Sequence, residues 1–175
     1  MNGPAAALSI RPAGSAALLA AQWEQTFRNA YAHLHRAADM DAYCATAFTV
    51  PAAQALIDDP RSDCRVAWRG EVAVGLSVLL LDADCPVRLD GSAAELKQLY
   101  VVPSEYGSGL GRRLFHNALE AAGQAGRRWL WLCVVDHNER AQRFYRRLGC
   151  AVIGRGPVLA LGTERLTSQI MTRRC

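Results

Sequence analysis

Apolar residues recur three or four positions apart through residues 14–36, which is the spacing of one face of a helix. The segment at 9–11, which precedes them, is expected to form a short strand. Two shorter helices are expected next, one ending at 48 and capped by Asp39 or Asp41, and one over 49–57. The second of these starts with threonine and an early proline, which are typical of an N-cap and a first turn. The first third of the chain is therefore expected to be mostly helical.

The rest of the chain is predicted to alternate between strands and helices. Residues 65–81 contain two apolar, β-branched runs separated by a glycine turn, which predicts a hairpin. A nearly continuous apolar run at 129–135 predicts a strand that is buried on both faces. The other expected elements are strands at 94–102, 150–154 and 165–172 and helices at 110–126 and 138–149.

Length and composition fit one domain over residues 1–175. Apolar residues make up 51% of the chain and charged residues 21%, which is the balance of a packed domain and not of a disordered chain. The six cysteines are scattered without the spacing of a disulfide framework, so reduced thiols and a cytoplasmic location are expected. No apolar run approaches the roughly 20 residues that a membrane helix needs, so no membrane partner is expected.

The charge pattern argues against nucleic acid and favours a small anionic ligand. Twenty Lys plus Arg against sixteen Asp plus Glu give a net charge of +4, which is too small and too dispersed for a nucleic-acid surface. The histidines do not suggest a metal site, because His33 and His35 lie two positions apart and point to different helix faces. His137 is expected in a solvated loop.

A glycine-rich segment joins the strand ending at Val102 to the helix that starts at Leu110. Glycine at 107, 109 and 111 leaves backbone amides accessible at the positive end of a helix, an arrangement that binds anions such as a pyrophosphate. A dinucleotide fingerprint counted from Gly107 would end on Arg112 instead of glycine or alanine, and no P-loop lysine follows. By itself, the segment is equally consistent with a flexible glycine turn.

A second segment follows after one expected helix and one expected strand. It reads Asn138, Ala141, Phe144, Tyr145 and Gly149 at the spacing N-x-x-A-x-x-F-Y-x-x-x-G. Together with the Q/R-x-x-G-x-G/A pattern at 106–111, it resembles the GNAT superfamily of acetyltransferases over 94–154. This resemblance implies a mixed α/β fold with a central, mostly antiparallel sheet of six or seven strands flanked by helices. The sheet would be splayed between the strand ending at Val102 and the strand 129–135, with acetyl-CoA in the opening.

The resemblance also implies roles for individual residues. Asn138 would contact the pantetheine arm, and Tyr145 would protonate the departing thiolate, since a thiol pKa near 8.5 and a phenol pKa near 10 make that transfer feasible. Glu95 would deprotonate the acceptor amine, although a strand-surface glutamate is equally open. The amides expected to hold the pyrophosphate are those of Gly107, Ser108, Gly109, Leu110, Gly111 and Arg112. The amides expected to polarise the acetyl carbonyl are those of Tyr100, Val101 or Val102.

Two positions depart from the superfamily pattern. Tyr106 stands where Gln or Arg is usual, which is expected to weaken one phosphate contact, and Cys150 stands where an aromatic residue usually follows Gly149. Tyr145 itself is expected to act in catalysis because Phe144 already supplies a core contact. Direct transfer is favoured over an acetyl-cysteine intermediate, since no cysteine except Cys133 is expected near the thioester.

The acceptor is less clear from the sequence. Looser similarity over most of the chain resembles the PaiA-type polyamine acetyltransferases, but the segment 162–165 offers one acid, Glu164, where a polycation would need several. Other acids that would have to gather at the acceptor entrance are Glu24, Asp39, Asp41, Asp58 and Asp59.

A small-molecule primary amine is therefore the favoured acceptor, and a polyamine stays open. The alternatives are a peptide or protein N-terminal acetyltransferase and a noncatalytic acyl-CoA binding module. Exposed strands of this fold often pair between copies, so a homodimer is a further expectation.

Overall fold

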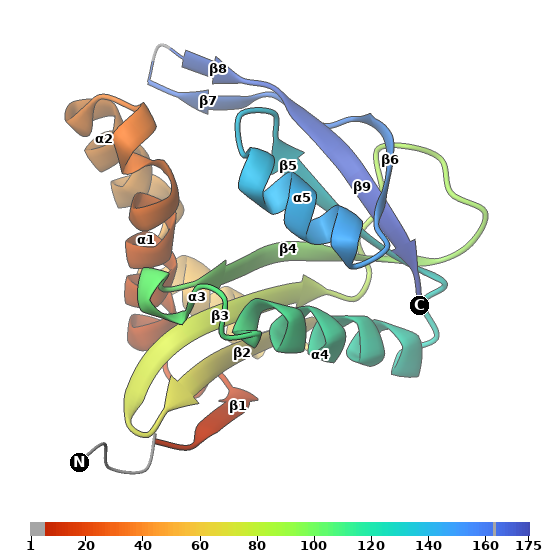
Figure 1. Cartoon of the computed structure of the whole chain (residues 1–175), viewed down its shortest axis with the longest axis horizontal. Coiled ribbons are helices and arrows are strands. Elements are labelled where there is room, and N and C mark those ends of the chain that lie inside the picture. The colour runs from red at the N-terminus through yellow and green to blue at the C-terminus, as the bar shows by residue number, and fades with distance from the viewer. Residues whose placement is uncertain (1–5, 163) are drawn as a thin grey trace.

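The computed structural model describes residues 6–162 and 164–175, and most of the described strands join one sheet. Seven strands form the sheet in the order β1-β2-β3-β4-β5-β9-β6, and β7 and β8 form a separate hairpin. Within the sheet, β4 and β5 run parallel and the other neighbouring pairs run antiparallel (Figure 1). The strands are β1 (Leu8–Pro12), β2 (Ser62–Arg69), β3 (Val72–Leu80), β4 (Ala93–Val101), β5 (Trp129–Val135), β6 (Ala151–Arg155), β7 (Leu159–Leu161), β8 (Glu164–Leu166) and β9 (Ser168–Arg174).

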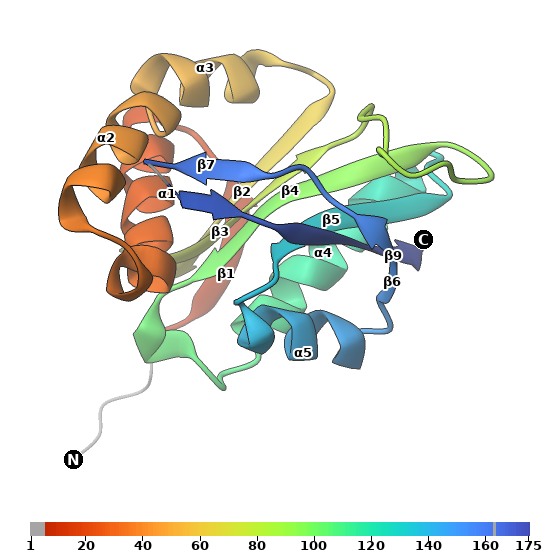
Figure 2. The same cartoon turned by 90° about the horizontal axis from the view of Figure 1, so that it is seen from above.

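Helices cover both faces of this sheet (Figure 2). The first three α-helices share a core with β2 and β3 that includes Phe27 and Leu76, while α4 and α5 share a core with β4, β5 and β9 that includes Phe115 and Leu132. The helices are α1 (Ala16–Tyr31), α2 (Ala37–Ala47), α3 (Val50–Asp58), α4 (Leu110–Gln124) and α5 (Glu139–Arg147), with short 3-10 turns η1 (Ala32–Leu34) and η2 (Pro103–Glu105). The predicted mixed α/β class with a seven-stranded, mostly antiparallel sheet is confirmed.

Two local predictions were wrong. The helix predicted to end at 48 is not capped by Asp39 or Asp41, because α2 begins earlier, at Ala37, and Arg36 occupies the N-cap without a side-chain hydrogen bond. Asp39 lies in the first turn instead, and the Asp41 carboxylate binds Arg28 at 2.7 Å. The predicted strand 165–172 is divided into β8 and β9, because Thr167 turns aside to accept a hydrogen bond from the Asp136 amide.

The parallel pair β4 and β5 separates after three residue pairs. Ala93, Ala94 and Glu95 face Trp129, Leu130 and Trp131, and no pairing between the two strands follows in the described chain. From Leu96 onward β4 therefore has a free edge toward β5, which we call the open edge of β4. The splay predicted between these two strands is present and begins at Glu95.

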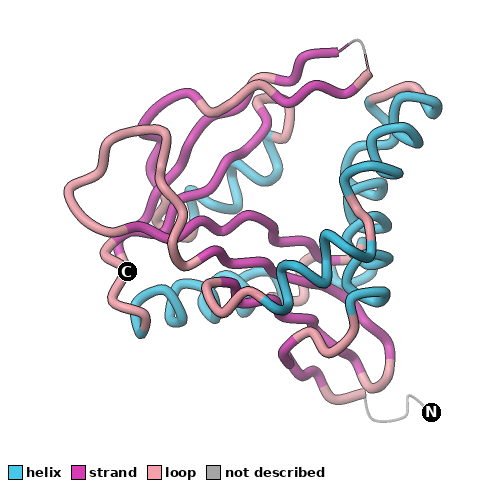
Figure 3. The backbone as a smooth tube through the Cα atoms, turned by 180° about the vertical axis from the view of Figure 1, so that it is seen from behind, coloured by secondary structure: helices cyan, strands magenta, loops and turns pink. Residues whose placement is uncertain are grey.

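The β7–β8 hairpin extends from the sheet toward the ends of α1 and α2 (Figure 3). Leu161 and Leu166 are buried in the core beneath α1 and α2, and a Cβ built on Gly162 would overlap the Asp39 side chain. Thr163 lies outside the described residues. Within the described residues, no helix is both long enough and apolar enough to cross a membrane.

Candidate functional site

The glycine loop, residues 106–111, follows η2 and leads into α4. Gly107 and Gly109 have φ of +83° and +85°, a region that side-chain-bearing residues rarely adopt. A Cβ at either position would meet open space, so no neighbouring group dictates glycine there except the backbone conformation. Gly111 differs, because a Cβ on it would lie 3.3 Å from the Phe144 ring. The three glycines therefore shape the turn and allow α4 to approach α5.

Four of the six predicted phosphate-binding amides are free in the described chain. Gly107, Gly109, Gly111 and Arg112 donate to no acceptor among the described residues, and the last two belong to the first turn of α4, where amides have no partner within the helix. The Ser108 amide donates to the Glu105 carbonyl, and the Leu110 amide donates to the Ser108 hydroxyl at 3.2 Å. The Ser108 and Leu110 amides are therefore engaged within the loop, contrary to the expectation that they are free to hold the pyrophosphate.

A partly buried ion pair fixes the start of this loop, and sequence analysis missed it. Glu105 is 7% exposed and accepts hydrogen bonds from the Arg69 guanidinium, one of them 2.8 Å long. This contact ties η2 to β2 and lowers the pKa of the Glu105 carboxyl. Thirty-six positions separate the two residues, so local patterns carry no sign of the pair.

Replacing Glu105 with Gln is expected to lower the free energy of unfolding by about 1–2 kcal/mol at neutral pH, because one charge-assisted hydrogen-bond partner is lost. In the wild type, the stabilisation by this ion pair is fully present above the ordinary carboxyl pKa. It is lost as the pH falls through the lowered pKa of Glu105. Urea unfolding of both proteins across that range measures the difference. An equal difference at every pH would contradict the assignment.

The amides of β4 face alternate directions, and this alternation selects which can meet a ligand. The Val102 amide donates to the Val74 carbonyl, so the pair Val74 and Val102 is hydrogen-bonded across β3 and β4. By the antiparallel alternation, the Tyr100 amide also faces β3, whereas Leu99 and Val101 face the open edge. Of the three amides predicted to polarise the acetyl carbonyl, only that of Val101 faces the open edge. The Leu99 amide also faces this edge, and the sequence analysis did not include it.

Glu95 lies where the splay begins, at the last paired position of β4. Burial raises the pKa of its carboxyl, and Lys97 opposes this rise. The carboxyl is close enough to the Cys85 and Cys133 thiols to raise their pKa values electrostatically. A partly buried carboxyl with a raised pKa at this position fits the predicted base.

Asn138 has a structural role at the start of α5. Its side-chain oxygen accepts a hydrogen bond from the Ala141 amide at 3.0 Å, and its side-chain nitrogen donates to the Tyr31 hydroxyl at 3.2 Å. Both the oxygen and the nitrogen of the side-chain amide are therefore engaged within the protein. The contact with the pantetheine arm stays a prediction. The contact also joins α5 to the end of α1.

Asn138→Ala is expected to destabilise the protein by about 1 kcal/mol, the usual loss on removing a helix N-cap. Asn138→Asp keeps an oxygen for the Ala141 amide and loses only the donor to Tyr31, so its stability should remain near wild type. Urea unfolding compares the three proteins. Equal losses in both variants would show that the cap is not the main contribution.

Tyr145 is the buried member of the Phe144–Tyr145 pair, contrary to the sequence argument. It is 8% exposed and packs beside Phe115 with ring centroids 6.0 Å apart, while Phe144 is only half-buried. Burial raises the pKa of the Tyr145 phenol, with smaller contributions from Cys150 and Tyr31. The hydroxyl therefore stays protonated over the whole neutral range.

A pocket lies between the β7–β8 hairpin and the end of α1. Its volume is about 230 Å³, and we call it the hairpin pocket. His35, whose side chain is 4% exposed, pairs through Nδ1 with a Glu164 oxygen at 2.7 Å. His137 is exposed in the turn between β5 and α5, as expected of a solvated loop residue, and it also lines this pocket. Its lining residues are Tyr31, His35, Val135, His137, Glu164 and Leu166.

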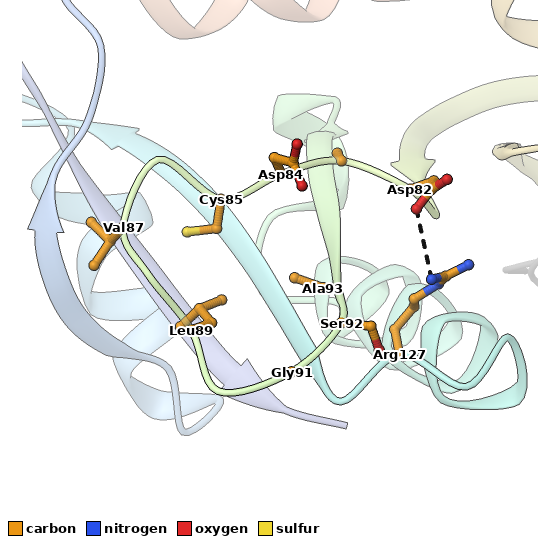
Figure 4. A pocket seen from close by; sticks show the side chains of 10 residues that line it. Asp82, Asp84, Cys85, Val87, Leu89, Gly91, Ser92, Ala93 and Arg127 are labelled. Atoms are coloured by element: carbon orange, nitrogen blue, oxygen red, sulfur yellow. Dashed lines mark ion pairs between the residues drawn. The ribbon is translucent and has the colours of Figure 1, made fainter.

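A second cavity, of about 200 Å³, lies under the loop between β3 and β4 (Figure 4). Asp82 forms an ion pair with Arg127 across it at 3.7 Å. The loop is held to β5 by the Trp131 indole, which donates to the Ala83 carbonyl at 3.1 Å. Over residues 6–162 and 164–175, no group of three or more His, Cys, Asp or Glu side chains is arranged to hold a metal.

Comparison with known proteins places these features in a family. The chain matches the acetyltransferase (GNAT) family model over residues 19–150. An N-acetyltransferase of Mycobacterium tuberculosis is 32% identical over 117 residues, which cover 67% of this chain and 70% of that protein. Streptothricin acetyltransferase of Streptomyces lavendulae is 32% identical over 123 residues, or 65% of this chain and 64% of that protein.

The fold has a solved counterpart with the coenzyme bound. PaiA N-acetyltransferase of Thermoplasma acidophilum in complex with coenzyme A matches with a TM-score of 0.77 and 17% identity, over 97% of this chain and 99% of that one. The free amides of the glycine loop and the open edge of β4 are suited to such a ligand. Because the family model spans more than half of the chain and includes both the glycine loop and α5, the chain belongs to the GNAT acetyltransferase family and is an acetyl-CoA-dependent N-acetyltransferase.

Proposed function

We propose that the protein acetylates a primary amine of a compact small molecule, which binds in the hairpin pocket. The observation that supports this proposal is the position of the pocket, which adjoins Asn138 through Tyr31 and is bounded on one side by Glu164 and Leu166 of the β7–β8 hairpin. Its volume of about 230 Å³ is below the 300–1,000 Å³ of typical drug-sized sites. A compact amine suits a space of this size better than the extended backbone of a peptide terminus does.

Each proposed group has one task in the reaction. Glu95 takes a proton from the ammonium form of the acceptor, directly or through a water, because only the neutral amine attacks a thioester. The amine nitrogen then bonds to the acetyl carbon while the Leu99 and Val101 amides stabilise the negative carbonyl oxygen. The carbon–sulfur bond breaks, and Tyr145 donates its hydroxyl proton to the departing thiolate. The nitrogen loses its remaining extra proton as the amide forms, and through solvent this proton restores the Tyr145 phenol.

Direct transfer is supported by the state of Cys133. Although the Cys133 side chain is exposed, partial desolvation raises the pKa of its thiol to about 11, with Glu95 contributing in the same direction. A thiol with that pKa carries little thiolate at neutral pH, and the thiolate is the nucleophilic form. An acetyl-cysteine intermediate at Cys133 is therefore disfavoured.

The carboxylates that would have to gather around a polycation contact other side chains of the protein instead. Glu24 and Asp41 both bind Arg28, and Asp59 binds Arg61, so these carboxylates do not converge on the hairpin pocket. Asp58 accepts from Gln54, and Asp39 lies beneath the hairpin. An amine with few positive charges fits this arrangement better than a polyamine. Streptothricin, named for one relative, belongs in the same screen.

A thiol-release screen with acetyl-CoA tests the proposal. It would compare amino acids and their amides, monoamines, polyamines, aminoglycosides, streptothricin and N-terminal peptides. The Leu166→Trp variant is expected to fill the hairpin pocket. Turnover of a compact amine by the wild type that is lower in this variant would support the proposal. Turnover confined to peptides, or a compact-amine activity unchanged by Leu166→Trp, would contradict it. Acetyl-CoA binding with no turnover on any amine would favour the binding-module alternative.

The remaining expectations have direct measurements. A homodimer predicts twice the monomer mass in light scattering after size exclusion. One domain over 1–175 predicts a single cooperative unfolding transition. The cytoplasmic location stays a prediction that cell fractionation can test.

A further inference from the structure

Tyr106 occupies the first position of the glycine loop, where Gln or Arg is usual in the family. A tyrosine supplies no charge to a phosphate at this position. However, the guanidinium of Arg140, from the first turn of α5, lies over the Tyr106 ring with its Cζ atom 3.3 Å from the ring centroid. A cation stacked on an aromatic face is held there by attraction to the ring. Arg140 is therefore placed beside the loop by Tyr106.

The charges around the loop are unfavourable without an anion. Arg112 and Arg113 lie in the first turn of α4, which has no acidic residue, and Arg140 lies in the first turn of α5. Cations at helix N-termini oppose the helix dipole. None of the three forms an ion pair with the described residues, whereas Arg143, one turn along α5, pairs with Glu139 at 2.9 Å.

We infer that Arg140 binds the pyrophosphate of acetyl-CoA and supplies the charge that Tyr106 does not. Tyr106 acts as a positioning residue, since its ring holds the guanidinium at the first residue of the glycine loop, whose Gly107 and Gly109 amides are free. The inference deepens the cofactor site of the enzyme and does not depend on which amine is acetylated. It replaces the expectation that Tyr106 weakens phosphate binding.

Calorimetric titration with coenzyme A gives a readout that is independent of turnover. Arg140→Ala is expected to raise Kd about tenfold or more, the usual scale for a lost charge-assisted hydrogen bond. Tyr106→Phe keeps the aromatic face and should bind like wild type, while Tyr106→Ala should lose part of the affinity. Once Arg140 is removed, Tyr106→Ala should have little further effect. Arg143→Ala is the matched control on the same helix.

A rescue and a truncated ligand sharpen the test. Tyr106→Arg combined with Arg140→Ala should restore affinity, because it returns the cation to its usual position in the family. The loss in Arg140→Ala should persist with 3′-dephospho-coenzyme A, since the pyrophosphate remains. Equal Kd values for Arg140→Ala and Arg143→Ala, or a loss that disappears with the dephospho ligand, would overturn the inference. Failure of the wild type to bind coenzyme A would instead contradict the cofactor site as a whole.

Discussion

Replacement of Glu95 by Gln is expected to reduce kcat/KM about 100-fold or more at neutral pH while leaving the Kd of acetyl-CoA unchanged. General-base catalysis is worth about 10²–10⁴-fold, and the neutral amide cannot accept the proton of the acceptor ammonium. Glu95 is the last residue of β4 that pairs with β5 and lies away from the glycine loop, so the substitution removes no phosphate contact. The matched control is Glu120→Gln, on the surface of α4, where the carboxylate only accepts a bond from Gln124.

The pH profile provides the decisive measurement for Glu95. Burial raises the pKa of its carboxyl, so the protonated, inactive form persists to a higher pH than for an exposed glutamate. Wild-type kcat/KM should therefore rise with pH through a value above about 4.3, the ordinary glutamate pKa. This acidic limb should be absent in Glu95→Gln and retained in Glu120→Gln. An unchanged limb in Glu95→Gln would assign the base to another residue.

Features that depend on local backbone chemistry were predicted well from the sequence. The turn at 106–111 that joins a strand to a helix was expected, and so was the helix that opens at Asn138, although the positive φ of Gly107 and Gly109 was seen only in the structure. Such requirements act within a few residues, so they leave a readable pattern. The strand order around the splay also followed, through the resemblance carried by these two segments.

Features that depend on register or on distant contacts were not predicted. Which β4 amides are free follows from the pairing of Val74 with Val102, and a shift of one residue would exchange Val101 for Tyr100. The pair of His35 and Glu164 joins residues 129 positions apart, from the end of η1 to the β7–β8 hairpin. Only the tertiary structure brings these groups together.

The expected roles of Phe144 and Tyr145 illustrate a related limit. Periodicity placed both on the inner side of α5, but it could not rank their burial. The close approach of Gly111 brings the Phe144 ring against α4, and Tyr145 turns into the core beside Phe115. Tyr145 therefore combines a packing role with its proposed chemical role, and a test must separate the two.

Tyr145→Phe makes that separation, because it removes the hydroxyl and keeps the buried ring. We expect kcat to fall about 100-fold, within the usual range for loss of a general acid, with little change in thermal stability or in the Kd of acetyl-CoA. Burial raises the pKa of the phenol, so the proton is present at every pH near neutrality. The same burial also disfavours a free thiolate, so the proton affinities of donor and acceptor rise together.

Tyr43→Phe is the matched control, since it removes a half-buried tyrosine hydroxyl from α2, where the ring packs on Phe27. Single-turnover transfer to the amine and calorimetry with coenzyme A would be measured for both variants. If Tyr145→Phe transfers the acetyl group as fast as Tyr43→Phe, the departing thiolate takes its proton from another source. In that case the buried ring of Tyr145 would serve only to pack α5 against α4.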